Sequence, residues 1–312
     1  MAQLMAGTNT WDARGHVMSG SNDIQTRKAI FGWMKDHEKT FFLPRQPVRP
    51  IGVYFSPKSR NYFAKEFIES YRGILLLLLQ SHLEFQIVTP RTLPEFHGEM
   101  LILPDVRCMG KGEVDYLGAY AGSGKTLIVT AETGKYDETG ASRSSNPVHQ
   151  LLGITNADEK RAGKKFIYYP NCPGRAYYAQ LRKEFDQQAA AGVWEQAEFN
   201  KLRKAFVAEI LAVSSLQPAV QIDASPFLSS QIANVGGKVS VFLANFKGLK
   251  SKEVALQAPE ENVTIVFSAS PPRTIAVLPF LGQMQKVQGT YKRGRLTCKL
   301  PPIDKGAVVR VE

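Results

Sequence analysis

The most constraining feature of the sequence is an alternation of short apolar runs with helical stretches between Ile51 and Gly134. The apolar runs are rich in β-branched residues, which is typical of strands buried on both faces of a parallel sheet. Right-handed crossovers between such strands give a doubly wound, flavodoxin-like layer, so the sequence predicts an α/β fold. The predicted elements are strands at 51–55, 84–89, 100–106 and 126–130, and helices at about 62–82 and 113–120.

The pattern of apolar residues changes in the second half of the chain. Apolar residues at three- and four-residue steps predict helices over 177–213, broken near Gly192, which complete a domain covering 51–215. From about 216 to 312 short apolar runs alternate with turn residues, and Gly236-Gly237 between two such runs predicts a tight hairpin. We therefore expect a C-terminal antiparallel β-sandwich.

The first 43 residues predict one strand, a loop and one helix, which cannot bury an apolar face without a partner. The residues expected near the buried face of this helix are Ile24, Ile30, Phe31, Met34 and Phe41. The segment PRQPVRP at 44–50 holds three prolines, which disfavour helix and predict a stiff linker.

Composition excludes few classes of protein. The formal net charge is +11, but the densest basic groups, at 160–165 and 201–204, carry no accompanying aromatic pattern, so nucleic-acid binding is not expected. Three separated cysteines form neither a zinc pattern nor a disulfide framework, and we expect packed thiols and no cofactor or metal. The apolar run 74–79 is far shorter than the roughly 20 residues of a membrane helix. With no signal peptide in the sequence, a cytoplasmic location is expected.

Two motifs suggest phosphate binding and nucleophilic catalysis, but the elements around them do not fit either role. AYAGSGKT, at 119–126, approaches the phosphate-loop pattern, but a phosphate loop follows a strand and opens a helix, whereas here a helix precedes and a strand follows. The layer also resembles the class I glutamine amidotransferase-like fold, whose cysteine nucleophile lies in a sharp turn after a strand. The matching turn here reads Ala131-Glu132-Thr133-Gly134 and contains no nucleophile, and Cys108 follows another strand without an adjacent histidine.

A wider resemblance covers most of the chain from Ile51 onward. The segments IGVYFSPKSRNYF, LLLQSHLEFQIVTP, LILPDVR and TAETGKYDETGASR, followed by a β-rich end, resemble the C-terminal portion of glycoside hydrolase family 42 β-galactosidases. The resemblance implies that residues 1–43 are the last strand and helix of a TIM barrel, that 51–215 is the β-galactosidase trimerisation domain, and that the chain forms a homotrimer.

The same resemblance bears on the site residues. The catalytic glutamates of that family come from earlier barrel strands, so no catalytic residue is assigned in this chain. The residues expected to remain of a sugar site follow the predicted barrel strand: Trp11, Asp12, Arg14 and His16. A core position for Trp11 and a surface loop for His16 are the alternatives. Asp137 and Glu138, adjacent acids in a Gly-flanked loop, are interpreted as a solvated turn.

These observations favour a non-catalytic C-terminal region of a β-galactosidase-like glycoside hydrolase, which mediates oligomerisation and completes a carbohydrate site. Two alternatives stay open: part of an active glycosidase whose barrel lies upstream or on another chain, and a stand-alone carbohydrate-binding module.

Overall fold

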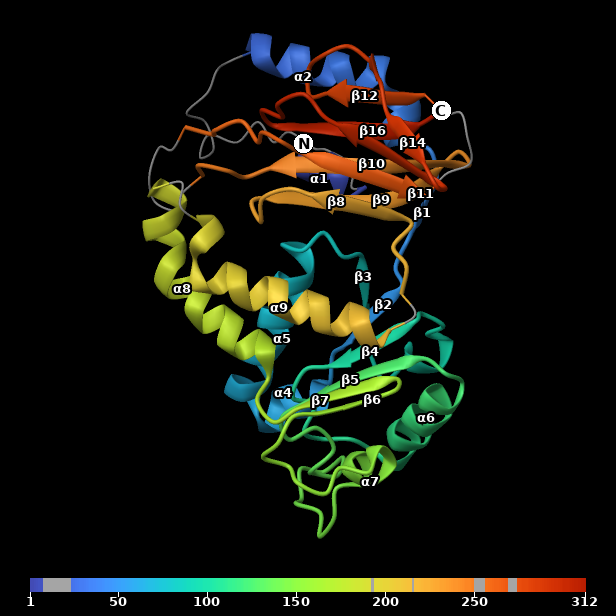
Figure 1. Ribbon diagram of the computed structural model, residues 1–312, viewed down its shortest axis with the longest axis vertical. Coiled ribbons are helices and arrows are strands. Elements are labelled where there is room, and N and C mark those ends of the chain that lie inside the picture. Colours follow the sequence, from blue (N-terminus) through green and yellow to red (C-terminus); the bar gives the residue numbers. More distant parts are fainter. Residues whose placement is uncertain (8–23, 192–193, 215, 250–255, 269–273) are drawn as a thin grey trace. The chain divides into compact units, whose positions relative to one another are not determined.

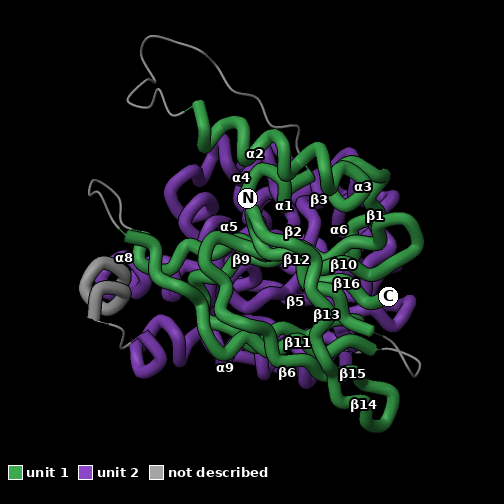
Figure 2. Tube along the Cα trace, turned by 90° about the horizontal axis from the view of Figure 1, so that it is seen from above, with its two compact units in different colours: residues 1–48, 219–312 green, residues 49–218 purple. Residues whose placement is uncertain are grey.

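The computed structural model describes residues 1–7, 24–191, 194–214, 216–249, 256–268 and 274–312. The chain forms two compact units, coloured separately in Figure 2. Residues 49–218 form one, called here the α/β unit. Residues 1–48 and 219–312 together form the other, called here the sandwich unit. The sandwich unit is therefore built from both ends of the sequence.

The α/β unit contains the parallel sheet that the sequence predicts, which has six strands and includes an antiparallel edge strand that was not predicted. Its order is β3-β2-β4-β5-β7-β6, with all pairs parallel except β6 with β7. Every residue of β2, β4 and β5 is buried, as expected of central strands covered on both faces. The strands are β2 (Ile51–Tyr54), β3 (Phe85–Val88), β4 (Met100–Leu103), β5 (Thr126–Thr130), β6 (Arg161–Gly163) and β7 (Phe166–Tyr169).

Helices cover both faces of this sheet (Figure 1). The predicted helix 62–82 corresponds to α5 (Ala64–Leu79), which confirms it. A short helix that was not predicted, α4 (Pro57–Tyr62), precedes it, and Ser56 caps α4 by accepting the N–H of Ser59. The backbones of α5 and α8 touch at Gly73 and Gly174, where a Cβ on Gly73 would lie 1.8 Å from the Gly174 oxygen. The helices are α4 (Pro57–Tyr62), α5 (Ala64–Leu79), α6 (Lys111–Gly122), α7 (Pro147–Leu152), α8 (Pro173–Ala191) and α9 (Glu198–Val213), with short 3₁₀ turns η1 (Leu93–Glu95) and η2 (Trp194–Gln196).

The sandwich unit has two antiparallel sheets, of order β1-β9-β10-β16-β12-β13 and β14-β15-β11-β8. Side chains of both sheets form one buried core, including Val241 and Val309 from the first and Ile265 and Phe267 from the second. Gly236 and Gly237 take positive φ values of 56° and 78°, which confirms the predicted hairpin between β9 and β10. The strands are β1 (Arg45–Pro47), β8 (Val220–Asp223), β9 (Leu228–Val235), β10 (Lys238–Asn245), β11 (Thr264–Ser268), β12 (Ile275–Pro279), β13 (Gln285–Val287), β14 (Thr290–Lys292), β15 (Arg295–Lys299) and β16 (Gly306–Val311).

Three N-terminal helices cover the outer face of the six-stranded sheet of the sandwich unit: α1 (Ala2–Met5), α2 (Ile24–Asp36) and α3 (Glu38–Phe41). The face predicted for the helix at 24–36 is partly wrong, since Ile24 and Phe31 are 51% and 42% exposed. Trp33 and Met34 are the buried side chains of α2 instead. The face is rotated because Trp33 packs against Phe41 and the sheet, and its indole nitrogen donates to the carbonyl of Gly282 at 2.9 Å.

Arg45 fixes these helices to the sheet. Its guanidinium lies 3.9 Å from the Phe242 ring and donates to the carbonyls of Leu4, Met5 and Phe41. Arg45 begins β1, which pairs with β9, so the segment predicted as a linker adds a strand to the sandwich. Prolines are tolerated there because β1 is an edge strand, and the boundary between the two units, after Val48, falls within the predicted linker. The assignment of residues 1–43 to a barrel remnant stays a prediction.

Candidate functional site at the carboxyl edge of the parallel sheet

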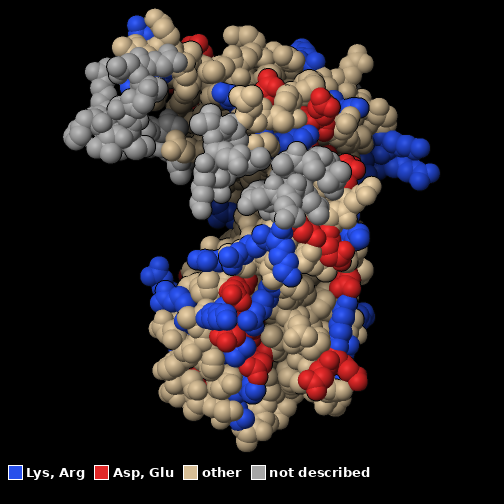
Figure 3. Space-filling view, turned by 90° about the vertical axis from the view of Figure 1, so that its left-hand side faces the viewer, with Lys and Arg blue, Asp and Glu red and all other residues tan. Residues whose placement is uncertain are grey.

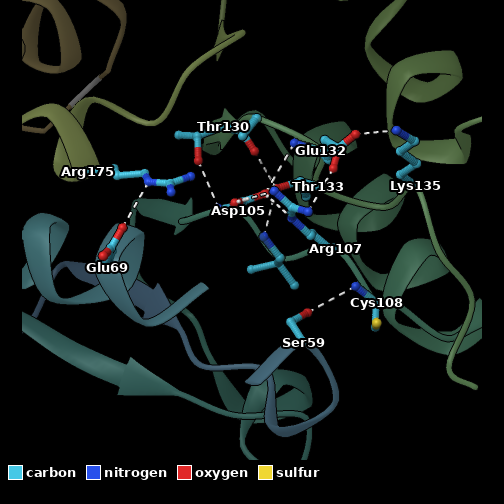
Figure 4. Close-up of polar contacts among 12 residues, drawn as sticks. Ser59, Glu69, Asp105, Arg107, Cys108, Thr130, Glu132, Thr133, Lys135 and Arg175 are labelled. Atoms are coloured by element: carbon cyan, nitrogen blue, oxygen red, sulfur yellow. Dashed lines mark hydrogen bonds and ion pairs between the residues drawn. The ribbon is translucent and has the colours of Figure 1, made fainter. Parts of the chain in front are cut away.

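Ligands in open α/β sheets bind beyond the carboxyl ends of the strands, so this edge is the first place to look for a site. Two charged side chains follow β4 there. Asp105 is buried, with a positive φ of 53°, and Arg107 donates to it from Nε at 3.1 Å and from Nη2 at 3.3 Å (Figure 4). Burial raises the pKa of Asp105, since the guanidinium offsets only part of the penalty for a buried carboxylate.

The turn after β5 completes this group. Glu132 lies 2.9 Å from Arg107 Nη1 and also binds Lys135, while the backbone N–H of Glu132 donates to Asp105 at 3.3 Å. Two threonines accept backbone N–H groups of the neighbouring loop: Thr130, the last residue of β5, from Asp105 at 2.9 Å, and Thr133, in the turn, from Val106 at 3.0 Å (Figure 4). We call Asp105, Arg107, Glu132 and Lys135 the edge network. It ties the loops after two adjacent strands together.

The edge network is unsuited to acid–base or nucleophilic catalysis. Its two carboxylates are bridged by one guanidinium, so they do not face a common open space as a glycosidase pair must. The backbone after β5 has the strained geometry of a nucleophile turn, with Ala131 at a φ of 52°, but the side chain there is a methyl group. The geometry of a reactive turn is therefore present without its reactive atom.

The thiols of the chain are buried, as predicted. Cys108 is fully buried, its backbone N–H donates to Ser59 Oγ at 2.9 Å, and burial raises the pKa of its thiol. Burial also raises the pKa of Cys172, and that of Cys298 to about 11. None is poised as a thiolate nucleophile.

Two further motifs have the structural roles that the sequence predicts. Helix α6 ends at Gly122, Gly124 takes a φ of 78°, and β5 follows, so the apparent phosphate loop is a helix-to-strand turn. Asp137 accepts the backbone N–H groups of Thr139 and Ala141 at 2.8 and 3.0 Å, together with the Thr139 hydroxyl. These hydrogen bonds lower the pKa of Asp137 and identify a capped surface turn.

The residues predicted to remain of a sugar site, Trp11, Asp12, Arg14 and His16, lie outside the described residues. The sequence analysis did not identify the edge network, although its residues lie in the loops that directly follow two buried strands, β4 and β5. Within the ranges that the structure describes, no three His, Cys, Asp or Glu side chains are grouped so as to hold a metal ion. Over the same ranges, no helix combines the length and apolar character needed to cross a bilayer.

The fold is similar to that of several solved glycoside hydrolases. α-L-Fucosidase isoenzyme 2 from Paenibacillus thiaminolyticus matches 90% of this chain with a TM-score of 0.63 and 11% identity, over 51% of its own chain. The family 42 β-galactosidase Gan42B from G. stearothermophilus matches 94%, with a TM-score of 0.58 and 10% identity, over 45% of its own chain. β-Galactosidase from Bacillus circulans sp. alkalophilus matches 95%, with a TM-score of 0.58 and 10% identity, over 46%.

These matches establish the architecture, a flavodoxin-like layer with a β-sandwich. The chain spans about half the length of the solved structures that it matches. No protein-family model matches the sequence, and no curated protein does.

Proposed function

We propose that this chain is a non-catalytic region of a glycoside hydrolase related to the family 42 β-galactosidases, which assembles the enzyme and completes a carbohydrate site beside a catalytic barrel. The observation that carries the proposal is the coverage of the structural matches. The matches cover 90%, 94% and 95% of this chain, which includes residues of both units, while about half of each enzyme has no counterpart here.

The chemistry of the carboxyl edge supports the non-catalytic part of the proposal. The carboxylates of the edge network are bound to Arg107, and the strained turn after β5 carries Ala131 in place of a nucleophile.

The assembly role is tested by multi-angle light scattering on the whole chain over a hundredfold range of protein concentration. A trimer has three times the 34.6 kDa of the monomer. A constant trimer mass is the expected result, and a monomer at every concentration would contradict the assembly role. The whole chain is used because removal of residues 1–43 would uncover the apolar face of the six-stranded sheet.

The non-catalytic role is tested separately with the same protein and a chromogenic β-galactoside. We expect no hydrolysis above the buffer rate by the chain alone. Turnover that follows the purified chain through two chromatographic steps would instead support an active glycosidase.

A further inference from the structure

The outer face of the four-stranded sheet β14-β15-β11-β8 carries a row of exposed cations. Leu296 and Cys298 of β15 point into the core, so the residues that alternate with them, Arg295, Thr297 and Lys299, point outward. Lys292 of β14 lies directly opposite Arg295 and thus on the same outer face. Lys292, Arg295 and Lys299 are all exposed.

These cations have no acidic neighbours along the chain. Residues 262–303 contain no Asp or Glu, although they hold six Lys and Arg. Among the described residues no carboxylate pairs with Lys292, Arg293, Arg295 or Lys299. On the α/β unit, by contrast, Lys and Arg side chains lie among Asp and Glu side chains on the face drawn in Figure 3.

The arrangement also opposes like charges. Lys292 and Arg295 form a cross-strand pair at the end of a hairpin, and Arg293 occupies the turn between them with a φ of 51°. Like charges directly opposite each other destabilise a sheet, and one acidic residue at either position would have given an attractive pair. Asp223, on the far strand β8, lies two strand spacings, roughly 10 Å, from Lys299. An anion from outside the chain would remove the repulsion.

We propose that this face binds an anionic polysaccharide. Lys292 and Arg295 would hold one sulfate or carboxylate group, and Lys299, about 14 Å further along β15, another. Between them the hydroxyls of Thr290 and Thr297, paired across β14 and β15, offer hydrogen bonds to sugar hydroxyls. The spacing therefore suits a chain of several sugar units.

A polysaccharide is favoured over a nucleic acid by the residues between the cations. Proteins that bind single strands stack bases on aromatic side chains. The outward positions of β14 and β15 carry threonines instead, and Tyr291 lies opposite Leu296, whose side chain points to the other face. The choice of a glycan rests also on the proposed function, whereas the cationic face stands without it.

The test is a binding titration of the whole chain with fluorescently labelled chondroitin sulfate, at several salt concentrations, with neutral dextran and single-stranded DNA as comparators. The variant is Lys292→Glu with Arg295→Glu. The matched control is Lys183→Glu with Lys204→Glu on α8 and α9, which changes the net charge equally at exposed positions of the other unit.

We expect the first pair to weaken chondroitin sulfate binding about tenfold or more and to reduce its salt dependence, and the control pair to change it less than about twofold. Lys292→Gln with Arg295→Gln, whose fold is checked by circular dichroism, should lose a similar part of the affinity. Equal losses for both charge-reversal pairs, no binding by the parent chain, or tighter binding of DNA than of chondroitin sulfate would each overturn the proposal. A monomeric mass in light scattering would contradict the assembly role and leave this result unaffected.

Discussion

The edge network of the α/β unit and the outer face of β14 and β15 use charge in opposite ways. In the edge network each charge is matched by another in the same chain, and the side chain of Asp105 is only 2% exposed. On the sandwich, Lys292 and Arg295 are exposed, face each other, and have no acidic partner in the described parts of the chain. The charges of the edge network are therefore paired within the fold, whereas those of Lys292 and Arg295 remain available to a partner.

The largest effect is expected from breaking the edge network. Arg107→Leu removes the counter-ion of Asp105 and leaves this carboxylate buried and uncompensated, while Glu132 keeps Lys135. We expect the free energy of unfolding, measured by urea denaturation at pH 7, to fall by about 3 kcal/mol. Lys111→Met is the control, because its pair with Asp115 is exposed and should contribute less than about 0.5 kcal/mol.

The pH dependence sharpens the same comparison. Burial raises the pKa of Asp105, so the folded chain retains a proton that the unfolded chain has released. The resulting stability is fully present below the ordinary pKa near 3.8 and is lost as the pH rises through the raised pKa. Without Arg107 the pKa of Asp105 rises further. The free energy of unfolding, measured by urea denaturation, should therefore fall more steeply between pH 4 and 7 for Arg107→Leu than for the parent chain. Asp105→Asn in that background should abolish the difference, and parallel curves for Arg107→Leu and the parent would contradict this explanation.

A smaller loss is expected where the network meets the backbone. Thr133→Val keeps the shape of the side chain but leaves the buried N–H of Val106 without its acceptor. We expect a loss of about 2 kcal/mol in the free energy of unfolding. Thr139→Val, at an exposed turn, should cost less than about 0.5 kcal/mol, and equal losses would show that burial is irrelevant here.

The smallest effect should have the opposite sign. Lys292→Glu places a carboxylate opposite Arg295 and converts a repulsive cross-strand pair into an attractive one. We expect the free energy of unfolding to rise by about 0.5 kcal/mol, while binding of chondroitin sulfate weakens. Lys292→Gln should lie between the parent and this variant. A loss of stability would show that the pair is not under electrostatic strain.

Local sequence pattern predicted the strands better than the sites. The runs TLIVT and LILPDV gave β5 and β4 because continuous apolar character directly reports burial on both faces. That Arg107 meets Glu132 depends on the adjacency of β4 and β5 in the sheet, which residue type does not encode. The signal that was available is that both residues follow buried strands closely.

The N-terminal helices show a second limit of prediction from sequence. The sequence predicted that they need a partner to bury an apolar face, but not that the partner is the sheet of β9 and β10, encoded far downstream. Periodicity alone also favoured Phe31 over Trp33, and only the packing against Phe41 and Phe280 decides between them.

The construction of the sandwich unit from both ends of the chain has a consequence for its synthesis. Residues 1–48 leave the ribosome before the α/β unit, but Arg45 and Pro47 pair with Val235 and Ala233, which follow only after that whole unit. The α/β unit can fold as its own strands emerge, whereas the apolar side chains of α1–α3 must wait uncovered. We expect slow maturation of the sandwich and a requirement for chaperones in that interval, during which the nascent chain is most prone to aggregation.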